Sequence, residues 1–245
     1  RDYTAMTDDE LKRDAAEVNE IPLAEVTDAQ VAAVKDQYDK DWKEWPVPYG
    51  APYVDRNRNG RYDAPPPFSD RFTVDSLITQ NRDEPGVAGG DPNSPADQVI
   101  WTASNDLDTD QSRAFQFSES VGLELQFTIW GYKRTDALGS VFFKRLKFIN
   151  KGGVDIGGGQ KGAFYIDSMY VCLWSDIDLG SFSDDLAGCD TTLSMAFIYN
   201  ANAIDLTYRR YGLPPPATGY DFFQGPKIAS PGDSGVFDLK RVRGF

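Results

Sequence analysis

The chain contains no histidine, and this absence excludes several kinds of chemistry. Activation of a nucleophile by a Ser-His-Asp or Cys-His arrangement, His-based zinc sites and His general bases are all excluded. Basic residues are also outnumbered, with 25 Lys and Arg against 38 Asp and Glu and a formal net charge of −13. This negative charge argues against nucleic acid and anionic membrane surfaces as partners. We therefore expect chemistry based on oxygen ligands, and no enzyme activity.

Long apolar runs and cysteines are scarce as well. No stretch approaches the roughly 18 residues of a membrane span, so no membrane insertion is expected. The chain starts at Arg1 rather than Met and stops at Phe245, which we interpret as a trimmed piece of a longer precursor. Cys172 and Cys189 form one disulfide if the protein is secreted, or they are two thiols that never meet. Both interpretations stay open.

The segment 55–63 has the spacing of a calcium-binding loop. Gly60 stands at loop position 6, where a sharp turn directs the next carbonyl, that of Arg61, toward an ion. A hard divalent cation takes six to eight oxygen ligands. We predict that one Ca²⁺ is bound by the Arg61 carbonyl and by the oxygen-bearing side chains at positions 1, 3, 5 and 9. These side chains are Asp55, Asn57, Asn59 and Asp63.

This loop differs from an EF-hand loop. Pro66 stands at position 12, where an EF-hand has a bidentate Glu, and no amphipathic helix flanks the loop. The loop resembles those of dockerins and thrombospondin type-3 repeats, in which a later carboxylate completes the ligand shell. Asp70 is the nearest downstream candidate. The alternative is a turn rich in Asp, Asn and Gly without an ion, because these residues favour turns.

A second acidic segment follows Trp174. It carries five carboxylates within fifteen residues, and like charges this close raise one another's pKa unless a cation or hydrogen-bond donors compensate. Three interpretations stay open: a second calcium site, a solvated acidic loop, or a carboxylate pair for glycoside hydrolysis. The five residues are Asp176, Asp178, Asp184, Asp185 and Asp190.

The first 46 residues predict a helical arm. Capping boxes at Thr7–Glu10 and Thr27–Gln30 start two helices, and Pro22 and Pro46 limit them. The second helix carries an apolar stripe that must be buried, on the protein's own sheet or on a neighbouring subunit. The stripe consists of Val31, Val34, Tyr38, Trp42 and Trp45.

The rest of the chain predicts a loop-rich segment and then a β domain. Proline and glycine dominate residues 47–98, which include the calcium-type loop. Alternating or strongly apolar segments in 99–245 predict strands, with a plain loop at Asn105–Asp110. The expected fold is mainly β, an antiparallel sandwich of the jelly-roll or immunoglobulin-like kind with an N-terminal helical pair. The predicted strands are 99–104, 122–131, 141–150, 163–174 and 193–200.

Taken in order, several short phrases resemble a group of large, uncharacterised secreted or cell-surface proteins. The phrases lie at 45–46, 50–60, 96–101, 105–108, 130–134, 174–180, 184–185, 188–191, 199–200 and 223–226. Proteins of this group often end in a sorting domain for type IX secretion, so the resemblance implies a place outside the cell or on its outer surface. It implies no particular activity.

These features lead to two functional hypotheses. The first is a structural or adhesive module stabilised by calcium, which engages other protein subunits, such as its own copies, or surface components. The second is a domain that binds or hydrolyses polysaccharide and uses the carboxylates of residues 176–190.

Overall fold

The computed structural model describes residues 6–64, 83–87, 96–166 and 169–223. These residues form ten strands and four α-helices, and the strands pair antiparallel in four small sheets. The chain divides into two compact units, Arg1–Tyr165 and Ile166–Phe245. The antiparallel strands and the N-terminal helical pair are thus confirmed, while the described architecture is mixed α and β rather than a clear sandwich. The predicted domain boundaries at 46 and 98 stay predictions.

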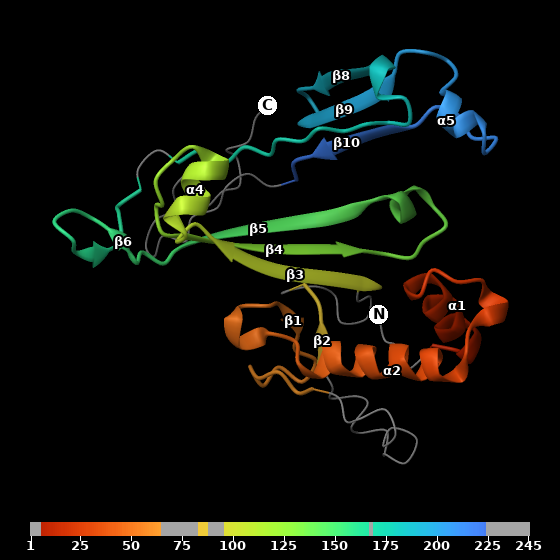
Figure 1. Cartoon of the computed structure of the whole chain (residues 1–245), viewed down its shortest axis with the longest axis horizontal. Coiled ribbons are helices and arrows are strands. Elements are labelled where there is room, and N and C mark those ends of the chain that lie inside the picture. The colour runs from red at the N-terminus through yellow and green to blue at the C-terminus, as the bar shows by residue number, and fades with distance from the viewer. Residues whose placement is uncertain (1–5, 65–82, 88–95, 167–168, 224–245) are drawn as a thin grey trace. The chain divides into compact units, whose positions relative to one another are not determined.

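The N-terminal arm is a helical hairpin of α1 (Asp8–Val18) and α2 (Asp28–Lys43), in red and orange in Figure 1. Both predicted capping boxes are present, with the Thr7 and Thr27 hydroxyls accepting the N–H groups of Glu10 and Gln30. Each cap satisfies helix N–H groups that lack an intrahelical partner. The two helices enclose a small core of buried residues. Its members are Leu11, Ala15, Val26 and Val34.

The apolar stripe of α2 packs differently from its expected position on the sheet. Val31, Val34 and Tyr38 belong to the core shared with α1. Trp42, only 4% exposed, donates its indole N–H to the Asp83 carbonyl at 2.8 Å, and Trp45 donates to the Pro52 carbonyl. The stripe is therefore used within the first unit, by α1 and by the loop-rich segment that follows α2.

The largest sheet consists of β3 (Gln98–Asn105), β4 (Leu123–Gly131) and β5 (Phe142–Asn150), with β4 in the centre (Figure 1). These three strands confirm three of the predicted ones. Alternation places Trp101, Thr128 and Arg145 side by side on one face. On the same face Gln126 and Thr128 are buried, at 4% and 5% exposure.

Several short elements complete the first unit. Strands β1 (Tyr53–Val54) and β2 (Glu84–Pro85) pair with each other, as do β6 (Val154–Asp155) and β7 (Lys161–Gly162). The 3₁₀ turns are η2 (Leu23–Glu25), η3 (Val47–Tyr49) and η5 (Ala137–Ser140). Helix α4 (Thr109–Gln116) occupies part of the predicted plain loop, because the Asp108 side chain caps it by accepting the Gln111 N–H.

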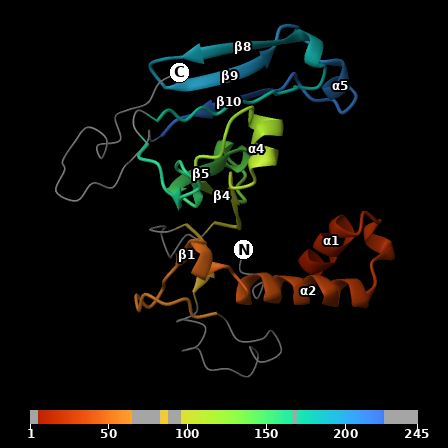
Figure 2. The ribbon, with the colours of Figure 1, turned by 60° about the vertical axis from the view of Figure 1, so that its left-hand side comes forward.

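The second unit is built on a sheet of β8 (Asp185–Asp190), β9 (Met195–Asn200) and β10 (Ala217–Asp221), with β9 in the centre (Figure 2). The turn η6 (Phe182–Asp184) precedes β8, and the short helix α5 (Leu206–Arg209) lies between β9 and β10. The predicted strand at 193–200 is confirmed as β9. Strand β8 was not predicted, because its acidic and small residues do not alternate with apolar ones.

The predicted strand at 163–174 is wrong for the residues that the structure describes there. Residues 163–166 and 169–174 belong to no strand, although many of them are apolar. Tyr165, Tyr170 and Trp174 are 93%, 92% and 80% exposed. The division between the two compact units falls inside this segment. A strand needs a partner for its backbone groups, and apolar composition alone does not supply one.

The two cysteines do not form a disulfide. Cys172 and Cys189 are both free and exposed. Among the described residues, no helix is both long and apolar enough to cross a membrane.

Candidate functional site

The loop at 55–63 closes around the side chain of Asp55. Its Oδ1 accepts the N–H of Asn59 at 3.2 Å, and its Oδ2 accepts the N–H of Gly60 at 2.7 Å. The chain makes this tight turn with left-handed backbone at Arg58 (φ +59°) and Gly60 (φ +74°). The glycine adopts that conformation without the steric cost that a Cβ brings. The turn predicted from Gly60 is therefore present.

The two asparagines link the middle of the loop to its end. The Asn57 and Asn59 amide groups donate to Asp63 Oδ2 at 2.8 and 2.7 Å. Their oxygens accept the backbone N–H groups of Asn59 and Arg61. All four predicted side chains thus belong to one network, and Arg61 belongs to it through its N–H. The predicted later carboxylate Asp70 lies outside the described residues.

Asp83 joins the loop from a distant part of the sequence. Its side chain is completely buried, at 0% exposure. Oδ1 accepts the N–H of Arg56 at 2.9 Å and Oδ2 accepts the N–H of Asp63 at 2.8 Å, so one carboxylate holds both ends of the loop. In return, the Asp83 N–H donates to the Asp63 carbonyl at 3.0 Å.

The three carboxylates act on one another electrostatically. Burial raises the pKa of the Asp83 carboxyl group, and the charges of Asp55 and Asp63 raise it further, against the lowering by the N–H groups of Asp63 and Arg56. The Asn57 and Asn59 amides lower the pKa of Asp63. The pKa of the Tyr53 hydroxyl is raised by burial and then by all three carboxylates. Negative charge therefore converges at this end of the first unit.

Aromatic residues attach the loop to α2. The Tyr62 hydroxyl donates to the Trp42 carbonyl at 2.6 Å, while the Trp42 indole donates to Asp83. Tyr62 also meets Tyr53 edge to face, with ring centroids 5.3 Å apart. On β2, Glu84 forms an ion pair with Arg56. The end of α2, the loop and the β1–β2 pair thus form one connected piece.

The oxygen-bearing groups of the loop suit a hard cation, although in this structure they form hydrogen bonds with other groups of the same loop. Carboxylate, amide and carbonyl oxygens are the ligands that Ca²⁺ prefers. In the described part of the chain, no three Asp, Glu or Cys side chains are arranged to hold a metal ion. At Asp63, two amide N–H groups point at the carboxylate. Calcium binding here requires both amides to turn their oxygens inward.

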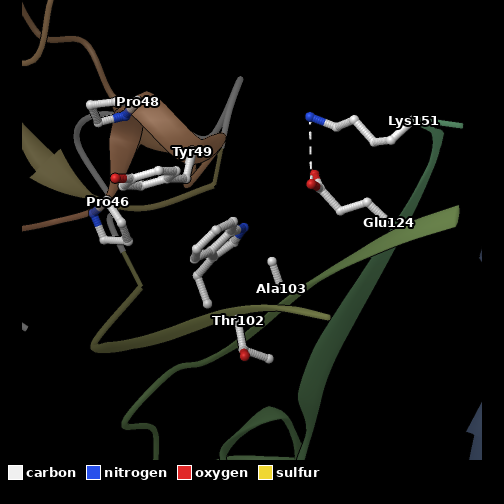
Figure 3. Close-up of a pocket in the computed structure, with 8 residues that line it drawn as sticks. Pro46, Pro48, Tyr49, Thr102, Ala103, Glu124 and Lys151 are labelled. Atoms are coloured by element: carbon white, nitrogen blue, oxygen red, sulfur yellow. Dashed lines mark ion pairs between the residues drawn. The ribbon is translucent and has the colours of Figure 1, made fainter. Parts of the chain in front are cut away.

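A surface pocket of about 440 Å³ lies between η3 and the large sheet (Figure 3). One wall is the η3 segment with Pro46, Pro48 and Tyr49. The opposite wall comes from the large sheet and the residue after it. Its members are Trp101, Thr102, Ala103, Glu124 and Lys151. This pocket was not predicted from the sequence, because its walls are more than 50 residues apart and share no motif.

The carboxylates of residues 176–190 do not gather as the loop carboxylates do. Asp176 and Asp178 are exposed. Asp185 Oδ2 accepts the Leu179 N–H at 2.8 Å, and Asp184 Oδ2 accepts the Asn202 amide at the same distance. Asp190 accepts the Thr192 hydroxyl and the N–H groups of Thr192 and Leu193, contacts that lower its pKa. Most of these contacts stabilise turns of the second unit.

Asp205, which was not among the predicted site residues, is the most buried carboxylate in the described part of the second unit. It is 2% exposed and accepts the N–H groups of Tyr208 and Ser181, both at 2.8 Å. These donors lower the pKa of Asp205, the Tyr208 N–H most strongly. Asn200, paired with Asp185 across β8 and β9, donates weakly to Asp205 and Asp184 at 3.3 Å. Asn200 Oδ1 and Asp185 Oδ1 are buried without a hydrogen-bond partner.

Asp83 and Asp205 gave different signals in the sequence. Asp205 precedes Leu206 as a helix N-cap, a position that Asp favours, so its capping role was readable. Asp83 stands in a stretch without periodicity, and only the pairing of β1 with β2 brings it to the loop.

No family model, curated protein or solved structure matches this chain.

Proposed function

We propose that this chain is a non-enzymatic structural or adhesive module of the cell exterior, stabilised by Ca²⁺ at the 55–63 loop. The observation that carries the proposal is the gathering of Asp55, Asp63 and Asp83 in one network with two asparagines. Three neighbouring carboxylates repel one another, and a divalent cation removes that repulsion. Asp83 is the residue that we propose in place of Asp70 as the later carboxylate, holding the loop ends.

The loop's attachments explain why an ion at this place stabilises more than the loop itself. Asp83 is bonded to the Trp42 indole at the end of α2, and Tyr62 to the Trp42 carbonyl. Trp45 reaches the Pro52 carbonyl on the other side of η3. Ordering the loop therefore orders the connection between the helical hairpin and the β1–β2 pair. A bound ion can order a segment that has little core of its own.

A second calcium site, with Asp184 and Asp185 as ligands, stays part of the proposal in a narrower form. Asp185 Oδ1 and Asn200 Oδ1 come from paired positions of β8 and β9, and both are buried without a donor. A cation between the strands would satisfy them. Asp176 and Asp178 are exposed and take no part in this pair of oxygens.

One observation, the pocket beside Tyr49, favours the glycan alternative. It supports the binding of a glycan rather than its hydrolysis. The module's location outside the cell rests on the resemblance described above. We propose other subunits or surface polysaccharides as its partners.

Limited proteolysis with and without Ca²⁺ tests the proposal. Calcium should protect wild-type residues 47–64 from cleavage, because the ion ties the loop to its neighbours. Asp55→Ala should remove this protection, since it deletes the acceptor of two loop N–H groups. Asp176→Ala is the matched control, an exposed aspartate outside the network, and should leave the protection unchanged. Equal cleavage of the wild type with Ca²⁺ and with a chelator would contradict the proposal.

A further inference from the structure

We propose that the pocket between η3 and the β3–β4–β5 sheet binds a neutral glycan, with a sugar ring stacked on Tyr49. The inference rests on the proposed function, because the loop that we assign to calcium follows directly on the segment that carries Tyr49. The proposed glycan site is separate from the acidic residues 176–190.

Hydrogen bonds hold the backbone of Tyr49 in place, while the residue remains exposed. Its N–H donates to the Pro46 carbonyl at 3.0 Å, and its carbonyl accepts the Gln126 amide at 3.1 Å. The residue is nevertheless 77% exposed. Neighbouring Pro46 and Pro48 restrict the backbone further. A fixed backbone lowers the conformational entropy that this aromatic residue loses when a ligand binds.

Gly50 explains how the Tyr49 wall comes so close to the sheet. Its backbone is left-handed, at φ +107°, and a Cβ there would lie 2.7 Å from the Gln126 amide nitrogen. Gln126 is itself buried at 4% exposure on the central strand β4. The close approach of the Tyr49 wall to the sheet is therefore a feature of the fold of the first unit, and so is the pocket between them.

The wall opposite Tyr49 carries a donor and an acceptor. Lys151 Nζ and Glu124 Oε2 form an ion pair at 3.4 Å, drawn as the dashed line in Figure 3. Glu124 Oε1 accepts the Gln126 amide at 2.7 Å, which fixes the carboxylate. A sugar hydroxyl both donates and accepts hydrogen bonds, so it can bind to both members of such a pair. The apolar face of the same sugar can rest on an aromatic ring.

Charge narrows the class of glycan to neutral ones. The chain carries a net charge of −13, which repels anionic polysaccharides at long range. The pocket's own ion pair is balanced and leaves no spare positive charge to reverse this. A proline-rich peptide is the competing ligand, because it also docks on aromatic residues. The charged wall favours hydroxyl groups over the apolar proline rings.

Calorimetric titration in Ca²⁺-containing buffer tests the proposal. The probes are a soluble β-glucan, a galactomannan and a xylan as neutral polysaccharides, polygalacturonate as an acidic one, and a polyproline peptide. Variants are Tyr49→Ala, Tyr49→Phe and Tyr211→Ala. Tyr211 is the matched control, since it is also 77% exposed but lies in the second unit.

We expect at least one neutral polysaccharide to bind the wild type. Tyr49→Ala should weaken its affinity by about tenfold or more, the size of an aromatic hot-spot loss. Tyr49→Phe and Tyr211→Ala should bind like the wild type. Binding of none of the three neutral polysaccharides, tighter binding of polygalacturonate, equal binding by Tyr49→Ala, or binding of the peptide alone would each overturn the proposal.

Failure of this inference and failure of the proposed function give different results. Calcium protection of residues 47–64 is measured without any glycan. If that protection is present and glycan binding is absent, only the pocket proposal fails. If glycan binding depends on Tyr49 but protection by calcium is absent, the pocket proposal stands and the calcium role fails.

Discussion

Each of the two units buries an aspartate almost completely, and these two carboxylates behave in opposite ways. Asp83 is 0% exposed and Asp205 is 2% exposed, and each accepts two backbone N–H groups. Yet the pKa of Asp83 is raised and that of Asp205 is lowered.

The difference arises from how burial is balanced: burial is the largest influence on the pKa of Asp83, whereas the N–H donors around Asp205 outweigh it. Asp83 shares its surroundings with the negative charges of Asp55 and Asp63, whereas hydrogen-bond donors dominate around Asp205. A carboxylate among donors holds a turn in place without further help. A carboxylate among carboxylates is better satisfied by a cation. The same residue type therefore marks a structural contact in one unit and a candidate ion site in the other.

The largest effect is expected from neutralising each carboxylate and measuring calcium affinity. Asp83→Asn should weaken Ca²⁺ binding by about 10- to 100-fold, the usual cost of losing a group that orients metal ligands. Asp205→Asn should leave the affinity of the 55–63 loop unchanged, because it lies in the other unit. Calorimetric titration with Ca²⁺ measures both. Equal affinities of Asp83→Asn and the wild type would remove the distinction between the two carboxylates.

A medium effect is expected from alanine substitution at two glycines that share a backbone conformation. Gly180 and Gly212 have φ of +71° and +69°. A Cβ at Gly212 meets nothing within 4 Å, whereas one at Gly180 lies 2.5 Å from Asp205 Oδ1. Gly212→Ala should cost about 1–2 kcal/mol of unfolding free energy, the cost of a left-handed non-glycine residue. Gly180→Ala should cost more, since it also displaces the buried carboxylate.

Chemical denaturation of the two glycine variants measures this difference. Two equal costs would mean that Asp205 moves aside freely and holds little in place.

The smallest effect is a pair of pH dependences with opposite signs, measured without calcium. The lowered pKa of Asp205 means that its contribution to stability is present above the usual pKa of 3.8 and is lost as the pH falls below that value. The raised pKa of Asp83 means the reverse: the folded loop becomes less stable as the pH rises from 3.8 through the raised pKa. Each dependence should disappear in the corresponding Asn variant.

Amide hydrogen exchange, expressed as protection factors, reports the two pH dependences locally. The N–H groups of Arg56 and Asp63 report on Asp83, and those of Ser181 and Tyr208 report on Asp205. Protection that changes in the same direction at both places would contradict the opposite pKa directions.

Local signals in the sequence predicted local structure well. The Thr7–Glu10 and Thr27–Gln30 boxes start the helices because their contacts span only three residues. The alternation in 122–131 correctly predicts strand β4, although its buried residues, Gln126 and Thr128, lie on the polar face and not on the apolar one. The failure at 163–174 has the complementary cause, since a run of apolar residues does not say whether a partner strand exists.

The candidate sites show the same limit. The four residues that spacing predicts as Ca²⁺ ligands, Asp55, Asn57, Asn59 and Asp63, lie within nine residues and share one hydrogen-bond network, while the bound ion stays a prediction. Asp83 and the Tyr49 pocket depend on contacts across 20 and 77 residues of sequence, which leave no local pattern. Stripe residues such as Trp42 were correctly predicted to be buried, while their packing partner was not.

The reciprocal bonds between Asp63 and Asp83 make the loop depend on a short pair of strands. The N–H and carboxylate of Asp83 bond to Asp63 across 20 residues of sequence, and Asp83 directly precedes β2. A change that separates β1 from β2 should therefore also release the end of the 55–63 loop.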